Sequence, residues 1–287
     1  MDILRRVGRV LFRATVNFDR DHGFDFAAVI SYFSLLSILP LCILLVAWGA
    51  AVIGSADMAE QGVKFLLRDL VRLLGDDVFA QAREVGSQAR RLGWPFMLIS
   101  LWTASKVFSK VEGALDHVFR VENRRSYPVR KVFSFGLVAV LAITILVLFV
   151  FSGVMTVLNG FLESTPLAEV KSNPLYAAVN SAVSRYLIPW LMTVFTFGFV
   201  YKVVPAVRVP WIAAGTAGLV AGSFWEILKN AFTLYLGRYA NYGRTYGAME
   251  AVVVFIIWVN LSAVLLLWGG ELAAILSGAR EELESGQ

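Results

Sequence analysis

Polar side chains inside the long apolar stretches of this sequence are candidates for chemistry. The candidate set is Ser31, Ser34, Ser37, Glu226, Asn260 and Glu271, together with Pro40, which follows the serines. Carboxyl, amide and hydroxyl groups are costly inside an apolar segment of a membrane protein, so they often bind or guide a polar group there. We therefore treat this set as a candidate substrate pathway.

Ser31, Ser34 and Ser37 are spaced three residues apart, and Pro40 follows them. A proline inside a helix removes a backbone hydrogen bond and bends the helix, and nearby hydroxyls can bind the freed backbone groups. The spacing predicts a bent helix with a polar stripe. The stripe either lines a substrate cavity or binds neighbouring helices as a structural contact.

Glu226 is in register with Gly218, Gly222 and Asn230 at intervals of four residues. Positions four apart share one helix face, so this carboxylate would lie on a face whose glycines let another helix approach. Lys229 follows three residues later and is within reach as an ion pair. The spacing fits a functional Glu226 and a purely structural ion pair equally well.

Asn260 and Glu271 are eleven residues apart, close to three turns, so both lie on one side of a predicted helix. Gly269 and Gly270 precede Glu271 and would allow close helix packing. The alternative for Glu271 is a position at the cytoplasmic end of the helix.

A second candidate group is basic and lies where apolar segments end. It consists of Lys106, Lys110, Arg124, Arg125 and Arg208. Such residues either extend along the helix ends toward the membrane surface, or form an inner rim that attracts anionic headgroups.

The elements that must position these residues are membrane helices. The chain is 58% hydrophobic and only 16% charged, and a segment of roughly 20 apolar residues spans the hydrocarbon layer as a helix. The fold class is therefore all-α, a polytopic bundle of six transmembrane helices. We expect them at 26–53, 92–116, 132–158, 175–204, 210–228 and 248–276.

The connection 54–91 has apolar residues at helical spacing with charges between them, which predicts an amphipathic helix outside the cytoplasm. Three regions follow: a tail at 1–25, the membrane domain at 26–276 and a tail at 277–287. Basic residues are more frequent on the face that holds both tails, and many of those on the other face lie in the long 54–91 connection, where charge has less orienting weight. Both termini are therefore expected to be cytoplasmic.

The sequence gives little support for an enzymatic function. It has one cysteine, Cys42, and two distant histidines, His22 and His117, and it contains no HExxH, P-loop or GxSxG motif. A disulfide, a metal centre or a bound cofactor is therefore not expected. The basic residues flank apolar segments, so nucleic acid is not an expected partner.

Four segments resemble the YihY/BrkB family of bacterial inner-membrane proteins. They are ISYFSLLSILPL at 30–41, YKVVPAVRVPW at 201–211, FWEILKNAFTLYL at 224–236 and YGAMEAVVVFIIWVNLSAVLLLWGGEL at 246–272. The family-like positions are Tyr32, Ser37, Pro40, Pro205, Arg208, Pro210, Glu226, Tyr246, Gly247, Trp258 and Glu271. The resemblance implies a six-helix protein of the inner membrane. The family has carried the label ribonuclease BN, which this sequence does not support because it provides no metal site for phosphodiester cleavage.

Together these features predict a non-enzymatic transporter or flippase-like protein for a lipid or an amphiphile. The alternative is a structural scaffold that binds partners through its glycine face and the amphipathic connection. Expected partners are membrane lipids, a second copy of the chain or envelope proteins.

Overall fold

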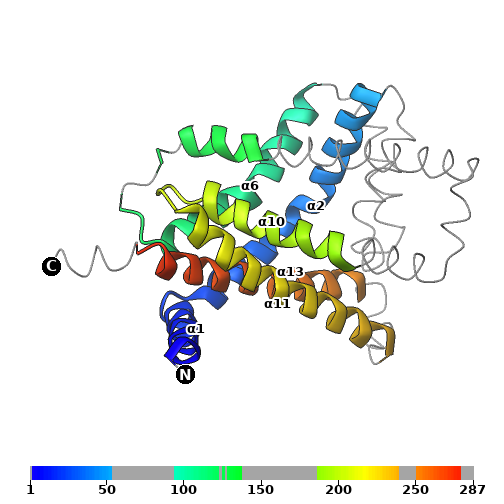
Figure 1. Cartoon of the computed structure of the whole chain (residues 1–287). Helices are drawn as coiled ribbons and strands as arrows, with labels where there is room; N and C mark the ends of the chain where they lie inside the picture. The colour runs from blue at the N-terminus through cyan, green and yellow to red at the C-terminus, as the bar shows by residue number, and fades with distance from the viewer. Residues whose placement is uncertain are drawn as a thin grey trace, which may run out of the picture.

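The structure, a computed structural model, describes residues 2–53, 94–122, 125–126, 128–137, 186–238 and 250–278, and in these ranges it contains helices and no strand. The helices labelled in Figure 1 are α1 (Asp2–Arg20), α2 (Gly23–Ile53), α6 (Trp94–Val118), α10 (Ile188–Val203), α11 (Trp211–Arg238) and α13 (Glu250–Leu276). The all-α prediction is therefore confirmed for this part of the chain. The connection 54–91, most of the segment 132–158 and residues 175–185 lie outside it.

Two of the described helices are long and apolar enough to cross a membrane, at Trp211–Leu236 and Val252–Leu276. The apolar helices Gly23–Ile38 and Ile188–Val203 are shorter. The described part of the chain thus supports two of the six expected spans by length and composition, and six remains a prediction.

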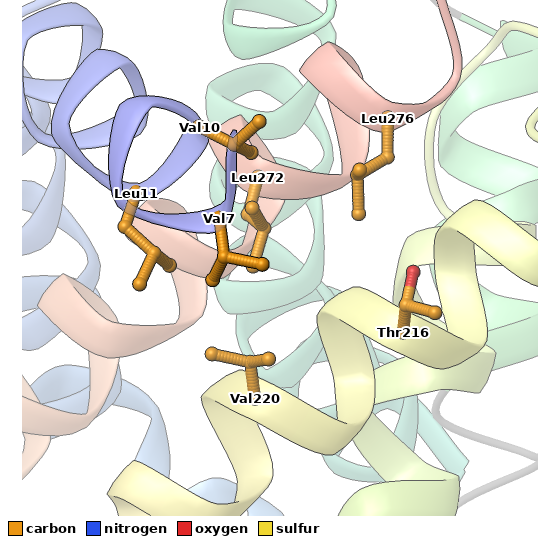
Figure 2. Close-up of a pocket in the computed structure, with 7 residues that line it drawn as sticks. All are labelled: Val7, Val10, Leu11, Thr216, Val220, Leu272 and Leu276. Carbon is orange, nitrogen blue, oxygen red and sulfur yellow. The ribbon is translucent and has the colours of Figure 1, made fainter. Parts of the chain in front are cut away.

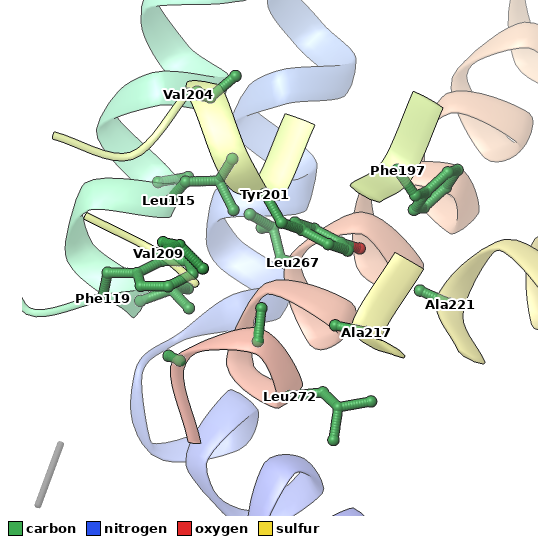
Figure 3. Close-up of a cluster of buried hydrophobic side chains, with 14 of the residues drawn as sticks. Leu115, Phe119, Phe197, Tyr201, Val204, Val209, Ala217, Ala221, Leu267 and Leu272 are labelled. Atoms are coloured by element: carbon green, nitrogen blue, oxygen red, sulfur yellow. The ribbon is translucent and has the colours of Figure 1, made fainter. Parts of the chain in front are cut away.

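Helix α13 is the centre of the bundle, because it contacts α1, α2, α6, α10 and α11. Figure 3 shows its Leu267 and Leu272 among side chains from α6, α10 and α11. Tyr201 of α10 lies in the middle of this cluster, fully buried, and donates a hydrogen bond from its hydroxyl to the carbonyl of Leu266 at 3.0 Å. A buried phenol needs such a partner, so this bond fixes α10 against α13.

Helices α10 and α11 pack with their backbones close together at glycines. A Cβ atom on Gly218 would lie 2.6 Å from the amide nitrogen of Gly198 and 2.9 Å from the carbonyl oxygen of Val194. Only glycine allows this approach, since the neighbouring atoms belong to the backbone. The face that carries Gly218 and Gly222 therefore packs a helix, as its spacing predicts, and the helix belongs to the same chain.

Helix α1 occupies a region that the sequence analysis treated as a tail. Its Ala14 and Phe18 are buried against the rest of the bundle, and Figure 1 shows it beside α13. The indole N–H of Trp268 donates a hydrogen bond to the hydroxyl of Thr15 at 3.1 Å. This hydrogen bond and the buried contacts therefore hold α1 against α13.

Candidate functional site

A polar cluster lies between α10 and α11. The hydroxyl of Thr193 donates a hydrogen bond to Oε1 of Glu226 at 2.7 Å, and Nζ of Lys229 lies 2.6 Å from Oε2. Both carboxylate oxygens therefore have a partner. The Lys229 ammonium also lies 5.3 Å from the ring centroid of Trp225, within the range of a cation–π contact. We call Thr193, Glu226 and Lys229 the Glu226 cluster.

The local sequence explains how the cluster forms. Gly218 and Gly222 bring α10 close to α11, so the short side chain of Thr193 reaches a carboxylate on the facing helix. Lys229 lies three residues beyond Glu226 on the same helix and needs no tertiary help to reach it. The three-residue spacing predicts this ion pair, whereas the contact of Thr193 was not predicted.

The carboxylate of the cluster lies near the middle of the stretch of α11 that is long enough to span a membrane. Glu226 is two to three residues beyond the midpoint of the 26-residue stretch Trp211–Leu236, which is about 4 Å along the axis at ~1.5 Å per residue. If this stretch crosses a membrane symmetrically, the ion pair lies near the bilayer centre. Charge at that depth is costly and is retained mainly where it contacts protein or a polar substrate.

A groove of about 400 Å³ lies between α1, α11 and α13, and it is open on one side. Figure 2 shows the lining side chains, which are Val7, Val10, Leu11, Thr216, Val220, Leu272 and Leu276. The hydroxyl of Thr216 donates to the carbonyl of Ile212 at 2.8 Å within its own helix. The walls of this α1 groove are therefore almost wholly apolar, which suits an alkyl chain.

This groove is not among the features predicted from sequence, because the arginines of 1–25 entered that prediction only through their orienting effect. The available signal was the helical spacing of apolar residues between them. Val7, Val10, Leu11, Ala14 and Phe18 follow the i, i+3, i+4, i+7, i+11 pattern of an amphipathic helix.

The serine stripe of α2 makes structural contacts. Ser31 is buried and donates to the carbonyl of Ala27 in its own helix at 2.7 Å. Ser37 is buried and donates to the carbonyl of Thr103 in α6 at 3.0 Å. Ser34 and Pro40 are half-buried on the same helix, which continues to Ile53. The contact of Ser37 favours the structural alternative for the stripe.

Asn260 is half-buried on α13, and Glu271 is fully buried. Glu271 lies five residues before the end of α13 and its side chain is buried in the bundle, which fits both a pathway residue and a position at the cytoplasmic end of the helix. Within the described ranges, no hydrogen bond or ion pair joins Glu226, Asn260 and the serines of α2 to one another. The structure thus distributes the proposed pathway residues over separate contacts, and none of them lines the α1 groove.

The proposed basic rim is also dispersed. Lys106 lies 3.9 Å from the ring centroid of Trp102, and Lys110 lies 4.7 Å from that of Phe33. Arg208 is exposed, and Arg124 lies outside the described residues. The side chain of Arg125, which is 22% exposed, contacts other groups of the protein through its guanidinium.

Arg125 belongs to a buried clamp that the sequence did not reveal. Its guanidinium donates to Oε1 of Glu112 at 2.9 Å and to the carbonyl of Val204 at 2.8 Å. One turn along α6, Oδ1 of Asp116 accepts a hydrogen bond from the backbone N–H of Ala206 at 2.9 Å. These contacts hold the turn between α10 and α11 against the end of α6. We call Glu112, Asp116 and Arg125 the inner clamp.

Among the residues that the structure describes, no group of three or more histidine, cysteine, aspartate or glutamate side chains is arranged to hold a metal ion. The carboxylates of the Glu226 cluster and the inner clamp instead contact basic side chains, the Thr193 hydroxyl and a backbone amide.

Comparison with known proteins gives one family. The model of the virulence factor BrkB family matches residues 14–287. A UPF0761 membrane protein of Chromohalobacter salexigens is 30% identical over 281 residues, which cover 97% of this chain and 64% of that protein. A UPF0761 membrane protein of Azotobacter vinelandii is 30% identical over 263 residues, covering 91% of this chain and 61% of its own length.

A protein of Bacillus subtilis named as ribonuclease-like, YfkH, is 26% identical over 254 residues, with 87% of this chain and 88% of that protein covered. The chain spans a little under two thirds of the length of the Chromohalobacter and Azotobacter relatives. No solved structure matches it.

Proposed function

Because this chain belongs to the virulence factor BrkB family of membrane proteins, we propose that it moves a lipid or another amphiphile across the membrane, as a transporter or flippase-like protein. The observation that carries the proposal is the Glu226 cluster, an ion pair near the middle of a helix long enough to span a bilayer. The proposal assigns no chemical transformation to the protein. Its location in the bacterial inner membrane, with both termini cytoplasmic, is part of the proposal.

The physical argument concerns the cost of passing a headgroup through hydrocarbon. A phosphate or other charged headgroup must lose water on its way across, and a fixed ion pair can exchange one of its partners for the headgroup. Lys229 is the group that would meet an anion, while Glu226, which accepts a hydrogen bond from Thr193, holds Lys229 in place. With no nucleotide-binding motif in the sequence, such movement would be passive, coupled to a gradient or driven by a partner.

The alternative function, a structural scaffold, would bind partners through two surfaces, and one of these is already occupied. The face of Gly218 and Gly222 is filled by α10 of the same chain, so it does not remain open for another protein. The second surface, the connection 54–91, lies outside the described residues.

The test is reconstitution of the full chain into liposomes that contain a fluorescent anionic phospholipid. Dithionite then reports whether inner-leaflet lipid reaches the outside faster than in protein-free vesicles. We expect acceleration by the wild type, loss of acceleration in Glu226→Gln, and wild-type rates in Glu122→Gln, an exposed carboxylate outside the helices. The absence of acceleration with the wild type would refute lipid translocation.

A charge exchange separates function from simple pairing. The double variant Glu226→Lys/Lys229→Glu keeps an ion pair at three-residue spacing but reverses the positions of its charges. A folded variant that no longer translocates lipid would assign a role to the placement of the charges. A variant as active as the wild type would reduce the pair to a structural contact.

A further inference from the structure

We propose that Lys106 and Lys131 form a binding site for a phosphate monoester, with both ammonium groups on the phosphoryl oxygens beside the ring of Trp102. The site lies where α6 meets the helical residues 128–137, and it shares no residue with the Glu226 cluster or the inner clamp. It does not depend on the proposed function, because a phosphate can bind there whether or not lipid crosses the membrane. The phosphate belongs either to a lipid headgroup or to a soluble ester, and binding measurements separate these two sources.

Two ammonium groups lie close to one indole ring. Nζ of Lys106 is 3.9 Å and Nζ of Lys131 is 5.3 Å from the ring centroid of Trp102. Both distances are within the range of a cation–π contact, which attracts a cation without neutralising its charge. Two positive charges are therefore held near each other, and this arrangement is unfavourable unless water or an anion offsets the repulsion.

The part of the chain that the structure describes supplies no carboxylate to these lysines. Neither Lys106 nor Lys131 forms an ion pair with an acidic side chain of the described ranges. Nζ of Lys131 donates a hydrogen bond to Oγ of Ser105 at 2.7 Å. An ammonium group has three N–H donors, so this bond leaves two donors of Lys131 for another acceptor. The pair thus combines uncompensated charge with donors that an anion can use.

Local packing holds Lys131 in a defined position against α6. Oγ of Ser109 and Oγ of Ser134 share a hydrogen bond of 2.8 Å, which joins α6 to the helical residues 128–137. Figure 1 shows this short helix meeting α6. Ser105 is fully buried, and its hydroxyl donates to the carbonyl of Trp102 at 2.7 Å while it accepts from Lys131. Because the donor and acceptor roles of this hydroxyl are both taken, it orients the ammonium group.

The charge around Lys131 supports an anion as the ligand. Burial, and after it the positive charges of Lys106 and Arg130, lowers the pKa of Lys131. An opposite charge at hydrogen-bond distance favours the protonated ammonium, whereas burial and like charges disfavour it. A bound anion would therefore offset both causes.

The charge of the pair favours a monoester over a diester. A phosphate monoester carries a charge of about −1.5 to −2 at pH 7 and offers three acceptor oxygens, whereas a diester carries a single charge. Lysine binds phosphate as a compact point charge on a flexible stem, so two lysines can meet one phosphoryl group. A diester would leave about one of the two ammonium charges uncompensated.

The first experiment compares monoesters with diesters on the full-length, delipidated protein. Native mass spectrometry with phosphatidic acid and phosphatidylglycerol of the same acyl chains tests the lipid source. Calorimetry with methyl phosphate and dimethyl phosphate tests the soluble source. We expect the monoester to bind about tenfold more tightly in at least one pair, the usual effect of one hydrogen bond to a charged group. A preference in the lipid pair alone assigns a headgroup, and a preference in the soluble pair assigns the phosphoryl group itself. No preference in either pair would overturn the proposal.

Substitutions locate the site. Lys106→Gln and Lys131→Gln should each weaken monoester binding about tenfold, because each removes a charged donor. Lys106→Arg keeps the charge and should retain most of the affinity. The matched control is Lys110→Gln, which removes a lysine one turn along α6 that lies 4.7 Å from the ring centroid of Phe33, and it should bind as the wild type does. Wild-type affinity in both glutamine variants at positions 106 and 131 would overturn the proposal.

A second measurement needs no variant and so does not depend on the folding of one. Acetylation of lysine amines in the wild-type protein, located by peptide mass spectrometry, reports the accessibility of each amine. The monoester that binds should slow acetylation of Lys106 and Lys131 several-fold and leave Lys110 unchanged. Equal rates at Lys106 and Lys131 with and without the monoester would refute a site at these residues.

Discussion

Oδ1 of Asp116 accepts a hydrogen bond from the backbone N–H of Ala206 at 2.9 Å, across 90 positions of the sequence. The carboxylate is buried at the end of α6, and the amide belongs to the turn that connects α10 to α11. The backbone amides of a turn lack the regular hydrogen-bond acceptors that a helix or a sheet provides. Here a side chain from another helix supplies the acceptor. The relative position of α6 and the α10–α11 pair thus depends on one aspartate.

Asp116→Ala should lower the stability of the protein, because it removes the side-chain acceptor of the Ala206 amide. The expected loss is about 1.5–3 kcal/mol, the usual value of a hydrogen bond to a charged group. Asp116→Asn keeps a carbonyl oxygen in place and should lose less. Thermal unfolding in detergent, followed by circular dichroism, measures the difference. Equal losses in the two variants would show that the charge, and not the acceptor, matters.

Arg125→Met should be among the most destabilising single changes in the described part of the chain. It leaves the carboxylate of Glu112, whose side chain is fully buried, without its cation, at a cost of about 3–5 kcal/mol. The double variant Glu112→Leu/Arg125→Met removes both charges and should recover most of that loss. Arg120→Met is the control, since the Arg120–Asp21 pair is 3.8 Å apart with a half-exposed arginine and is worth only ~0–1 kcal/mol.

Gly218→Ala should separate α10 from α11. The new methyl group would lie 2.6 Å from the amide nitrogen of Gly198, and backbone atoms cannot rotate away as a side chain does. Gly215→Ala is the matched control, because a Cβ there meets no atom within 4 Å and should stabilise the helix by about 1 kcal/mol. Disulfide trapping between cysteines placed on α10 and α11 reports their separation. Equal trapping in the two variants would contradict the close approach.

Tyr201→Phe should destabilise the protein by about 1 kcal/mol, because it removes a single hydrogen bond and leaves the carbonyl of Leu266 without the hydroxyl donor. Tyr186→Phe, at a position 63% exposed, should change stability by only a few tenths of a kcal/mol. The free energies of unfolding in denaturant compare the two. An effect of Tyr186→Phe as large as that of Tyr201→Phe would point to loss of the aromatic hydroxyl in general and not to the contact with α13.

The features predicted correctly from sequence are those that depend on neighbours in sequence. The glycine face of α11 and the ion pair between Glu226 and Lys229 follow from intervals of three and four residues within one helix. The apolar stretches of α11 and α13 follow from composition alone. Such regularities need no knowledge of which helices pack together.

The contacts that sequence reasoning missed join distant parts of the chain. Thr193 and Glu226 are 33 positions apart, and Thr15 and Trp268 are 253 apart, and no periodicity in either segment names its partner. Arg125 was assigned to an inner rim because its charge was visible, whereas Glu112, its buried partner, becomes evident only after α6 and the following turn are folded together. These contacts are set by the tertiary packing of the helices, which the local sequence does not reveal.

The docking of α1 on α13 has a consequence for the order of biogenesis. Thr15 is synthesised 253 residues before Trp268, which is roughly ten to fifty seconds at ~5–20 residues per second. Throughout that interval the apolar side of α1 lacks its final neighbour, and the membrane surface is the place where an amphipathic helix can shield that side. Helix α1 is therefore expected to dock on α13 only after α13 has been synthesised and inserted.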